Sequence, residues 1–463
     1  MVFSSIPFLF YFLPAVLLCY FLVPARLRQG RNLVLLLASL LFYFYGEPRG
    51  IALMLLSIAG NYLFAFRLAG RRRRLWLILA VGFNLAILGV FKYADFAVQN
   101  LNRLPGVELP LPGIVMPIGI SFFTFQGMSY LFDVYRGRVP AQRNLLYVAT
   151  YISMFPQLVA GPIVRYETVA GALEARRESL SDAAAGAGHF VRGLAKKMLL
   201  ANAMGEIADA LFAADPAVLA APTAWVGAAA YAFQIFFDFS GYSDMAIGLG
   251  RIFGFAFPEN FSYPYAARSV TAFWRRWHMS LSGWFRDYVY IPLGGSRRGL
   301  KRQLVNILIV WALTGLWHGA AWNFVGWGLW FALLLILEKL FLLRALDRAP
   351  RVFGHVYTLL CVLLGWVLFR SPTLPHAAGY FAALLRPAAP DAGGQALYYL
   401  RQYLPEWLAC LLFSLPVIPA LRRRFEARRW YAPAAAVLTL LLLALSLLSV
   451  VSSSFNPFLY FRF

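Results

Sequence analysis

Residues 273–295 read FWRRWHMSLSGWFRDYVYIPLGG, and the basic turn SRRGLKR at 296–302 leads to LTGLWHGAAWN at 313–323. This stretch carries His278 and His318, two of the five histidines, and long apolar runs lie on both sides of it. Polar or broken backbone at membrane depth is tolerated only where protein buries it or where it lines a wet cavity. The pattern therefore predicts a polar centre enclosed by apolar helices.

Composition places the whole chain in a bilayer. Hydrophobic residues make up 61% of the 463 residues and charged residues only 13%, whereas soluble proteins carry about 25% charged residues. Apolar runs recur from end to end, each near the roughly 20 residues that a spanning helix needs. We predict an all-α, polytopic integral membrane protein that forms one domain over 1–463, with about 11–13 transmembrane helices and a catalytic core at about 230–330.

Basic clusters in short loops give the expected orientation, because Lys and Arg concentrate on the cytoplasmic side. The net charge is +22, but it is divided among loops and forms no continuous stripe, which argues against nucleic-acid binding. The N-terminus is then extracytoplasmic. The predicted spans are 7–24, 32–46, 51–68, 75–92, 114–135, 198–213, 223–250, 303–318, 321–343, 353–369, 404–421 and 431–451.

Two stretches fit badly as spans. Residues 145–164 contain Pro156, Gly161 and Pro162, and residues 262–296 are too polar, so we expect both to be re-entrant or interfacial. The charged segment 166–182 is expected at the cytoplasmic surface. Residues 370–403 are expected to form an external loop with a short helix.

Two carboxylates lie within the predicted span 223–250, at Asp238 and Asp244. A carboxylate at membrane depth is costly and marks a candidate functional site. The structural alternative is an aspartate that pairs with an internal arginine or caps a re-entrant helix. An aspartate that orders the catalytic loop would satisfy both interpretations.

Residues 271–288 are expected to form one amphipathic helix, capped by Ser269 and stopped by Pro292. At 100° per residue, one face carries Thr271, Arg275, His278, Ser282 and Arg286, and the neighbouring face carries Trp274, Trp277, Leu281, Trp284 and Tyr288. Such a helix either lies in the interface with its tryptophans in lipid or lines a cavity and offers arginines to an anion such as the phosphates of CoA. The candidate donor-binding residues are Arg275, Arg276, Arg286, Ser282 and Trp277.

His318 is the strongest candidate for a catalytic base. It sits between Trp317 and Gly319 at the end of a predicted span, and Gly315 and Gly319 allow another segment or a ligand to approach closely. Burial favours the neutral, basic form of histidine. The alternative is a core histidine with its hydrogen bonds satisfied. We find no metal-ligand spacing among the His, Cys, Asp and Glu residues, and we expect no bound cofactor.

Several motifs together resemble the membrane-bound O-acyltransferase family, in particular its bacterial branch that O-acetylates alginate. They are MVFSSIPFLFYFLP, RNLVLLLASLLFYFYGEP, MPIGISFFTFQGMSYLFDVYRG, FPQLVAGPIVRY, FQIFFDFSGYSDMAIGLGRIFGF, FSYPYAARSVTAFWRRWHMSLSGWFRDYVYIPLGG, LTGLWHGAAWNFVGWGLW and NPFLYFRF. The family's histidine motifs fall on His318 and His278. The resemblance implies a ring of transmembrane helices around a thinned centre in the bacterial cytoplasmic (inner) membrane.

The resemblance also implies a reaction. Acetyl-CoA is the expected co-substrate on the cytoplasmic side. The acetyl group would pass to an extracytoplasmic polysaccharide such as alginate, directly or through a periplasmic or extracellular partner protein. His318 would act as the base, His278 or a backbone N–H would stabilise the oxyanion, and Asp287, Trp317 and Asn323 would support the site. Peptidoglycan, cellulose or teichoic acid are alternative acceptors, and a transporter without chemistry is the alternative class.

Overall fold

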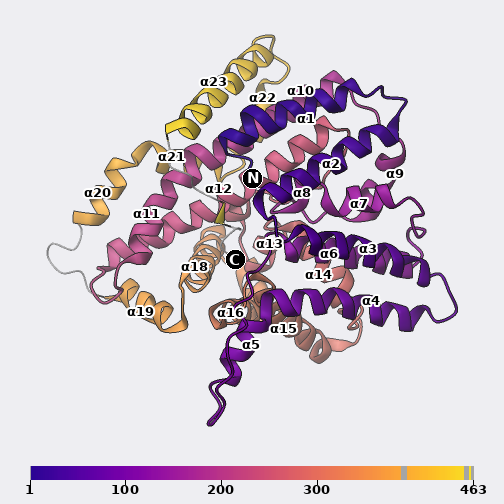
Figure 1. Ribbon diagram of the computed structural model, residues 1–463. Helices are drawn as coiled ribbons and strands as arrows, with labels where there is room; N and C mark the ends of the chain where they lie inside the picture. The colour runs from indigo at the N-terminus through magenta and orange to yellow at the C-terminus, as the bar shows by residue number, and fades with distance from the viewer. Residues whose placement is uncertain (1, 387–393, 453–457, 460–463) are drawn as a thin grey trace. The chain divides into compact units, whose positions relative to one another are not determined.

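The computed structural model describes residues 2–386, 394–452 and 458–459. All regular structure within these ranges is helical, which confirms the predicted class (Figure 1). The chain forms two compact units, residues 2–190 with 242–258, and residues 191–241 with the described part of 259–459. The described residues do not include 387–393, which are part of the predicted external loop. They also leave out most of the C-terminal motif NPFLYFRF.

The first unit is built around α6 (Ile120–Tyr135), which is buried on almost every side. Helices α3 and α4 pack against α6 and run beside each other (Figure 1). The elements of this unit are η1 (Pro7–Phe12), α1 (Leu13–Leu22), α2 (Arg28–Gly46), α3 (Ile51–Arg67), α4 (Arg73–Leu88), η2 (Gly89–Tyr93), α5 (Ala94–Leu101), α6 (Ile120–Tyr135), α7 (Leu145–Ser153), α8 (Phe155–Leu158), α9 (Tyr166–Glu174) and most of α10 (Leu180–Ala195).

The structure corrects the start of the fifth predicted span. Residues 114–119 are not helical, and α6 begins at Ile120 after Gly119, whose φ of 76° is left-handed. A Cβ at Gly119 would also lie 3.0 Å from the carbonyl oxygen of Leu158. Glycine is therefore required both for the turn and for the close approach of the neighbouring segment.

The segment 145–164 is interrupted, as its prolines and glycines predict. Helix α7 ends at Ser153, α8 ends at Leu158, and the backbone then continues without a helix to Tyr166. Residues 148–164 are all buried. Protein therefore covers this broken backbone, which is the condition for placing such a segment at membrane depth.

Most residues of the segment 166–182 are exposed or half-buried, as expected for a surface segment, but Arg176 is an exception. Arg176 is only 6% exposed, and its guanidinium donates to Asn32 Oδ1 at 2.7 Å and to the hydroxyl of Tyr20 at 2.9 Å. Glu178 forms salt bridges with Arg28 and Arg31. Arg176 and Glu178 thus join an internal ion cluster in the first unit, because their partners lie on α1 and α2.

The second unit contains the long helix α12, whose last part belongs to the first unit, and the hairpin of α15 and α16. Its elements are η3 (Lys196–Ala201), α11 (Asn202–Ala213), α12 (Ala221–Ile252), η4 (Pro264–Ala266), α13 (Val270–Trp274), α14 (Met279–Phe285), η5 (Arg286–Tyr290), α15 (Gly299–His318), α16 (Trp322–Leu337), η6 (Glu338–Leu342), α17 (Leu343–Arg348), α18 (Arg351–Arg370), α19 (Leu374–Leu385), α20 (Gly394–Gln402), α21 (Leu404–Phe413), α22 (Val417–Phe425) and α23 (Tyr431–Ser452).

Glycines set the close packing of α15 on α16. A Cβ at Gly315 would lie 2.4 Å from the carbonyl oxygen of Phe324, and a Cβ at Gly328 would lie 2.3 Å from that of Trp311. Small residues let helix backbones approach in this way in membrane proteins. The expectation that Gly315 permits close approach of another segment is confirmed, and that segment is the start of α16.

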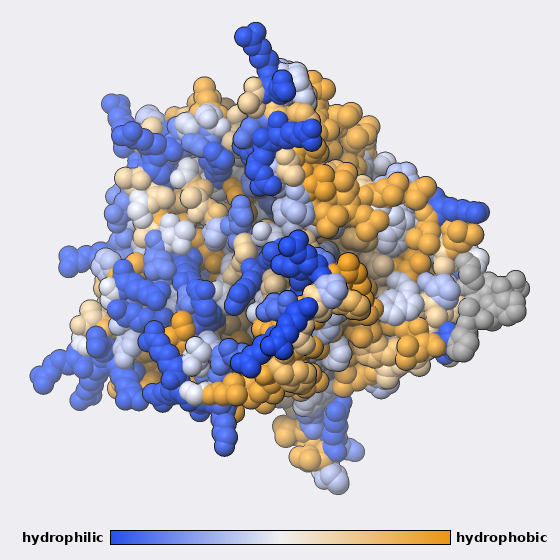
Figure 2. Space-filling view, turned by 180° about the vertical axis from the view of Figure 1, so that it is seen from behind, coloured by the Kyte–Doolittle hydropathy of each residue, from blue (hydrophilic) through white to orange (hydrophobic). Residues whose placement is uncertain are grey.

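The outer surface is apolar in the manner of a membrane protein. Leu440 and Leu448 on α23 are each 66% exposed, and Figure 2 shows broad apolar areas beside hydrophilic ones. Within the described residues, three helical stretches are long and apolar enough to cross a bilayer by themselves: Arg73–Leu101, Arg351–Arg370 and Tyr431–Ser452. Each other predicted span overlaps a shorter or more polar helix. The span 404–421 is corrected to a pair, α21 and α22, bent by 69°.

Candidate active site

His318 is the last residue of α15, at the point where the chain turns into α16. Its side chain is buried, with 7% exposure. Its ring meets three aromatic rings nearly edge to face, at centroid distances of 4.9 Å from Trp317, 4.9 Å from Trp327 and 5.2 Å from Phe369. These rings enclose the imidazole in an apolar cluster.

His278 lies between α13 and α14 and corrects the prediction of one continuous helix over 271–288. Its φ of 46° is left-handed, so the helix stops after Trp274 and restarts at Met279. The break turns the side chain inward, where it is 2% exposed and its ring lies 4.6 Å from that of Phe239. Helical periodicity could not reveal this, because the left-handed residue changes the direction of the chain.

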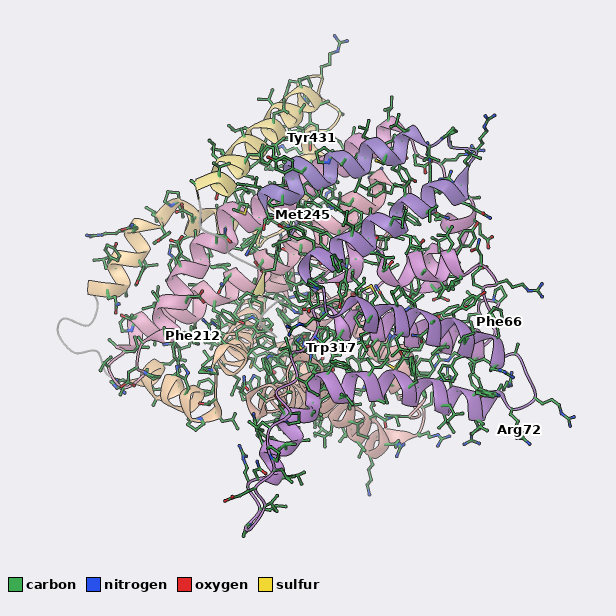
Figure 3. All side chains as sticks on the ribbon, viewed as in Figure 1. Phe66, Arg72, Phe212, Met245, Trp317 and Tyr431 are labelled. Carbon is green, nitrogen blue, oxygen red and sulfur yellow. The ribbon has the colours of Figure 1, made fainter. Side chains whose placement is uncertain are left out.

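Trp317 contacts both histidines. Its ring centroid lies 6.0 Å from that of His278 and 4.9 Å from that of His318. The indole is 3% exposed and lies in the densely packed interior (Figure 3). The structure therefore brings the two predicted histidines to one tryptophan, although 40 positions of sequence separate them.

Asn260 holds the turn that contains His278, and its role is not evident from the sequence. Its backbone oxygen accepts from Met279 N–H at 3.0 Å. Its Oδ1 lies 3.2 Å from His278 Nδ1 and accepts from the N–H and the hydroxyl of Ser280, at 3.2 Å and 2.9 Å. Burial lowers the pKa of His278 well below its usual range. The sequence signal is a polar residue, in FPENF at 257–261, in the loop that follows α12.

The predicted basic face is divided by the break at His278. Arg275, Ser282 and Arg286 are exposed and Arg276 is half-buried, while His278 is buried away from them. Arg286 Nε donates to Asp287 Oδ1 at 2.7 Å. The arginines therefore present cations on an exposed surface, and the histidine does not share that surface.

Trp277 is a packing residue of the aromatic cluster. It is 3% exposed, and its ring lies 4.8 Å from that of Trp366 and stacks on Phe273 at 5.5 Å. The ring of Phe261 meets it at 90°. Of the two alternatives for the tryptophans, a position in lipid does not hold for Trp277, because its side chain is buried and the helix ends at Trp274. Its candidate role in donor binding stays a prediction.

The predicted supporting residues lie in different places. Asp238 forms a buried ion pair with Lys197, at 2.6 Å. This agrees with the alternative that the aspartate pairs with an internal cation, although the cation is a lysine and not an arginine. Asn323 Nδ2 donates to the backbone oxygen of Ser371 at 2.9 Å and ties the start of α16 to the end of α18. Asp244 belongs to the first unit, where it lies 3.4 Å from His189.

Glu338 is a further residue that the sequence analysis missed. Its side chain is buried, and its carboxylate accepts from the backbone N–H groups of Val270 and Thr271, at 2.6 Å and 2.8 Å, and from the hydroxyl of Thr271 at 2.6 Å. An anion at a helix N-terminus is favourable. The signal in the sequence is one carboxylate after the apolar run of α16. Ser269 caps the same turn by accepting from Ala272 N–H, as predicted.

Replacing Glu338 by Ala should lower the free energy of unfolding by about 1–3 kcal/mol, because two buried backbone donors lose a charged acceptor. Thermal unfolding in detergent measures the difference. Thr271→Val removes one hydroxyl donor and leaves both N–H bonds, so it should have the smaller effect. An equal loss for the two variants would contradict the capping role.

No group of three or more His, Cys, Asp or Glu residues that could hold a metal ion is found in the part of the chain that the structure describes. The second unit offers one imidazole, that of His318, in an apolar cluster and a second one, that of His278, held by Asn260. Such groups suit proton transfer from a hydroxyl to a base. Together with the exposed arginines, they suit transfer of a group from an anionic donor.

Comparison with known proteins gives consistent matches. The sequence model of the MBOAT, or membrane-bound O-acyltransferase, family matches residues 114–369. A probable alginate O-acetylase, AlgI, of Azotobacter vinelandii is 40% identical over 100% of both chains. A peptidoglycan O-acetyltransferase of Helicobacter pylori is 35% identical over 81% of this chain and 78% of the relative. A teichoic acid D-alanyltransferase of Bacillus subtilis is 28% identical over 59% and 73%, respectively.

Proposed function

This chain belongs to the membrane-bound O-acyltransferase family, and on that premise we propose that it transfers acetyl groups from acetyl-CoA to hydroxyl groups of alginate. The assignment of alginate as the acceptor rests on the 40% identity with a probable alginate O-acetylase over the full length of both chains. Family membership makes the chain a membrane acyltransferase and removes the alternative of a transporter without chemistry. Peptidoglycan is the second acceptor to test, because a relative 35% identical to this chain modifies it.

The proposed location is the bacterial cytoplasmic membrane, with the N-terminus outside. Acetyl-CoA then binds from the cytoplasm, and the acetyl group leaves on the opposite side, either on the polysaccharide or on a periplasmic or extracellular partner protein. The bacterial relatives and the exposed apolar surface support this location. The distribution of Arg and Lys among short loops supports the orientation.

His318 is the proposed general base. Its imidazole removes the proton from the acceptor hydroxyl as the oxygen attacks the carbonyl carbon of the thioester. A C–O bond forms, the C–S bond breaks, and its electron pair leaves on the sulfur of CoA. The imidazolium then returns the proton to this thiolate, so that the base is regenerated and no proton is gained or lost.

The exposed arginines are the proposed contacts for the phosphates of CoA. Arg275 and Arg276 lie in the turn between α13 and His278, and Arg286 begins η5 directly after α14. A guanidinium is a planar donor that binds phosphate oxygens in pairs. Asp287 holds Arg286 at 2.7 Å and limits the number of orientations that it samples.

The test is a deletion of the gene in an alginate-producing host, complemented with the wild-type chain. We expect acetate on the exported alginate to disappear on deletion and to return on complementation, as measured by mass spectrometry. Membranes with radiolabelled acetyl-CoA test the donor. If alginate keeps its acetate while muropeptides lose theirs, the acceptor is peptidoglycan and the alginate assignment is wrong.

A further inference from the structure

The orientation of the Asn260 side chain is determined by a backbone group. The N–H of Ser280 points at it at 3.2 Å, and a backbone N–H can only donate. The atom that faces it is therefore the carbonyl oxygen Oδ1 and not the amide nitrogen. The hydroxyl of Ser280 donates to the same oxygen at 2.9 Å.

This orientation assigns the proton on His278. Nδ1 lies 3.2 Å from Oδ1 of Asn260. Because that oxygen accepts, Nδ1 must carry the hydrogen. The ring is buried in an apolar cluster and neutral, so its other nitrogen, Nε2, carries a lone pair and no hydrogen.

We propose that Asn260 is a positioning residue that holds His278 as the Nδ1–H tautomer, so that Nε2 serves acyl transfer as a hydrogen-bond acceptor that orients the hydroxyl to be acylated. This inference rests on the proposed function. The Nδ1–H tautomer excludes the role of oxyanion stabiliser for Nε2 of His278, because a nitrogen that bears a lone pair and no hydrogen cannot donate to an oxyanion. Stabilisation of the oxyanion must then come from another donor, such as a backbone N–H.

The backbone around Asn260 points to the same role. Within the described residues, Tyr263 and His278 are the two non-glycine residues with positive φ. The N–H of Ser262 donates to the backbone oxygen of Arg276, and the N–H of Met279 donates to that of Asn260. Left-handed conformations of such residues persist where the surrounding contacts over-determine them, and they cluster at functional sites.

The first measurement reads the tautomer directly in the wild-type protein. The full chain is labelled with ¹⁵N-histidine, and long-range proton–nitrogen correlation assigns which ring nitrogen carries hydrogen. His278→Asn identifies the signals, because asparagine tolerates the left-handed conformation. We expect hydrogen on Nδ1 and none on Nε2. Hydrogen on Nε2 in the wild-type protein would overturn the proposal, whatever the activity of any variant.

Variants of Asn260 test the positioning role. Asn260→Leu removes the acceptor at similar volume, and we expect loss of the single tautomer together with a fall in kcat of about 10- to 100-fold. The KM for acetyl-CoA should change little. Asn260→Asp keeps an acceptor for both donors and should retain the tautomer and more activity than Asn260→Leu. Unchanged tautomer and kcat in Asn260→Leu would contradict the proposal.

Ser280→Ala is the matched control. It removes the hydroxyl but keeps the backbone N–H that orients Asn260, so the tautomer should be retained. The tautomer readout needs no acyl acceptor and separates the two hypotheses. If His318 variants stay active while His278 keeps its Nδ1 hydrogen, the proposed base is wrong and the tautomer stands. If His318 variants lose activity while wild-type His278 carries its hydrogen on Nε2, the tautomer proposal is wrong and the proposed function stands.

Discussion

Replacing His318 by Gln should lower acetyl transfer by about 10²- to 10⁴-fold while the protein still folds, because positioned general bases contribute a factor of this size. Glutamine keeps a polar side chain of similar length but cannot take a proton at neutral pH. The loss should appear in kcat, since the imidazole is buried among Trp317, Trp327 and Phe369, whereas the arginines proposed to bind the donor are exposed or half-buried. Initial rates with labelled acetyl-CoA measure it.

His376→Gln is the control for this experiment. His376 is a half-buried histidine in the same unit, and its Nδ1 lies 3.2 Å from the hydroxyl of Ser371. It has no assigned role in the reaction, so its variant should transfer acetyl at the wild-type rate. Size-exclusion profiles and melting curves of both variants establish folding. Wild-type activity in a folded His318→Gln protein would remove His318 from the mechanism.

Breaking the buried pair of Lys197 and Asp238 should destabilise the protein by about 3–5 kcal/mol, because one charge stays buried without its partner. Both side chains are 3% exposed, and Lys197 Nζ donates to Asp238 Oδ1 at 2.6 Å. Asp238 Oδ2 also accepts from Leu459 N–H at 2.8 Å, and the ring centroid of Phe458 lies 4.7 Å from Nζ. Lys197→Met therefore breaks the ion pair and removes the cation beside Phe458.

A double variant separates charge burial from packing. Lys197→Met with Asp238→Leu removes both charges, and we expect it to be more stable than Lys197→Met alone, since a hydrophobic replacement of both partners is often neutral. Glu426→Ala is the surface control. It breaks the salt bridge between Arg422 and Glu426, whose side chains are 70% and 52% exposed, respectively. The free energy of unfolding should fall by less than about 1 kcal/mol. A Lys197→Met protein as stable as the wild type would contradict the prediction.

Local sequence patterns were sufficient to predict the helical class and to select His318 and His278 as candidate site residues. Apolar runs of near-spanning length predicted the helices, because burial in a bilayer requires continuous apolar residues. Pro156, Gly161 and Pro162 predicted the break in 145–164, because proline and glycine are unfavourable inside a helix and three of them fall within seven residues. Ser269 was recognised as a cap from its position alone.

The same reasoning failed where long-range contacts decide the conformation. Periodicity over 271–288 predicted one helix with His278 on its basic face, but Asn260 stabilises a left-handed turn there. Arg176 was expected at the surface because charged residues usually are, yet Tyr20 and Asn32 bury it. In each case the deciding partner is distant in sequence.

Hydropathy, glycine placement and motif order identify this chain as a helical membrane acyltransferase and mark His318 and His278, because each of these signals is contained in a short segment. Which groups surround those histidines is decided by packing between segments. Trp317 meets both rings, Asn260 orients His278, and Lys197 neutralises Asp238. A hydrogen bond or an ion pair joins whichever residues the folded backbone brings within about 3 Å, and no local pattern encodes that distance.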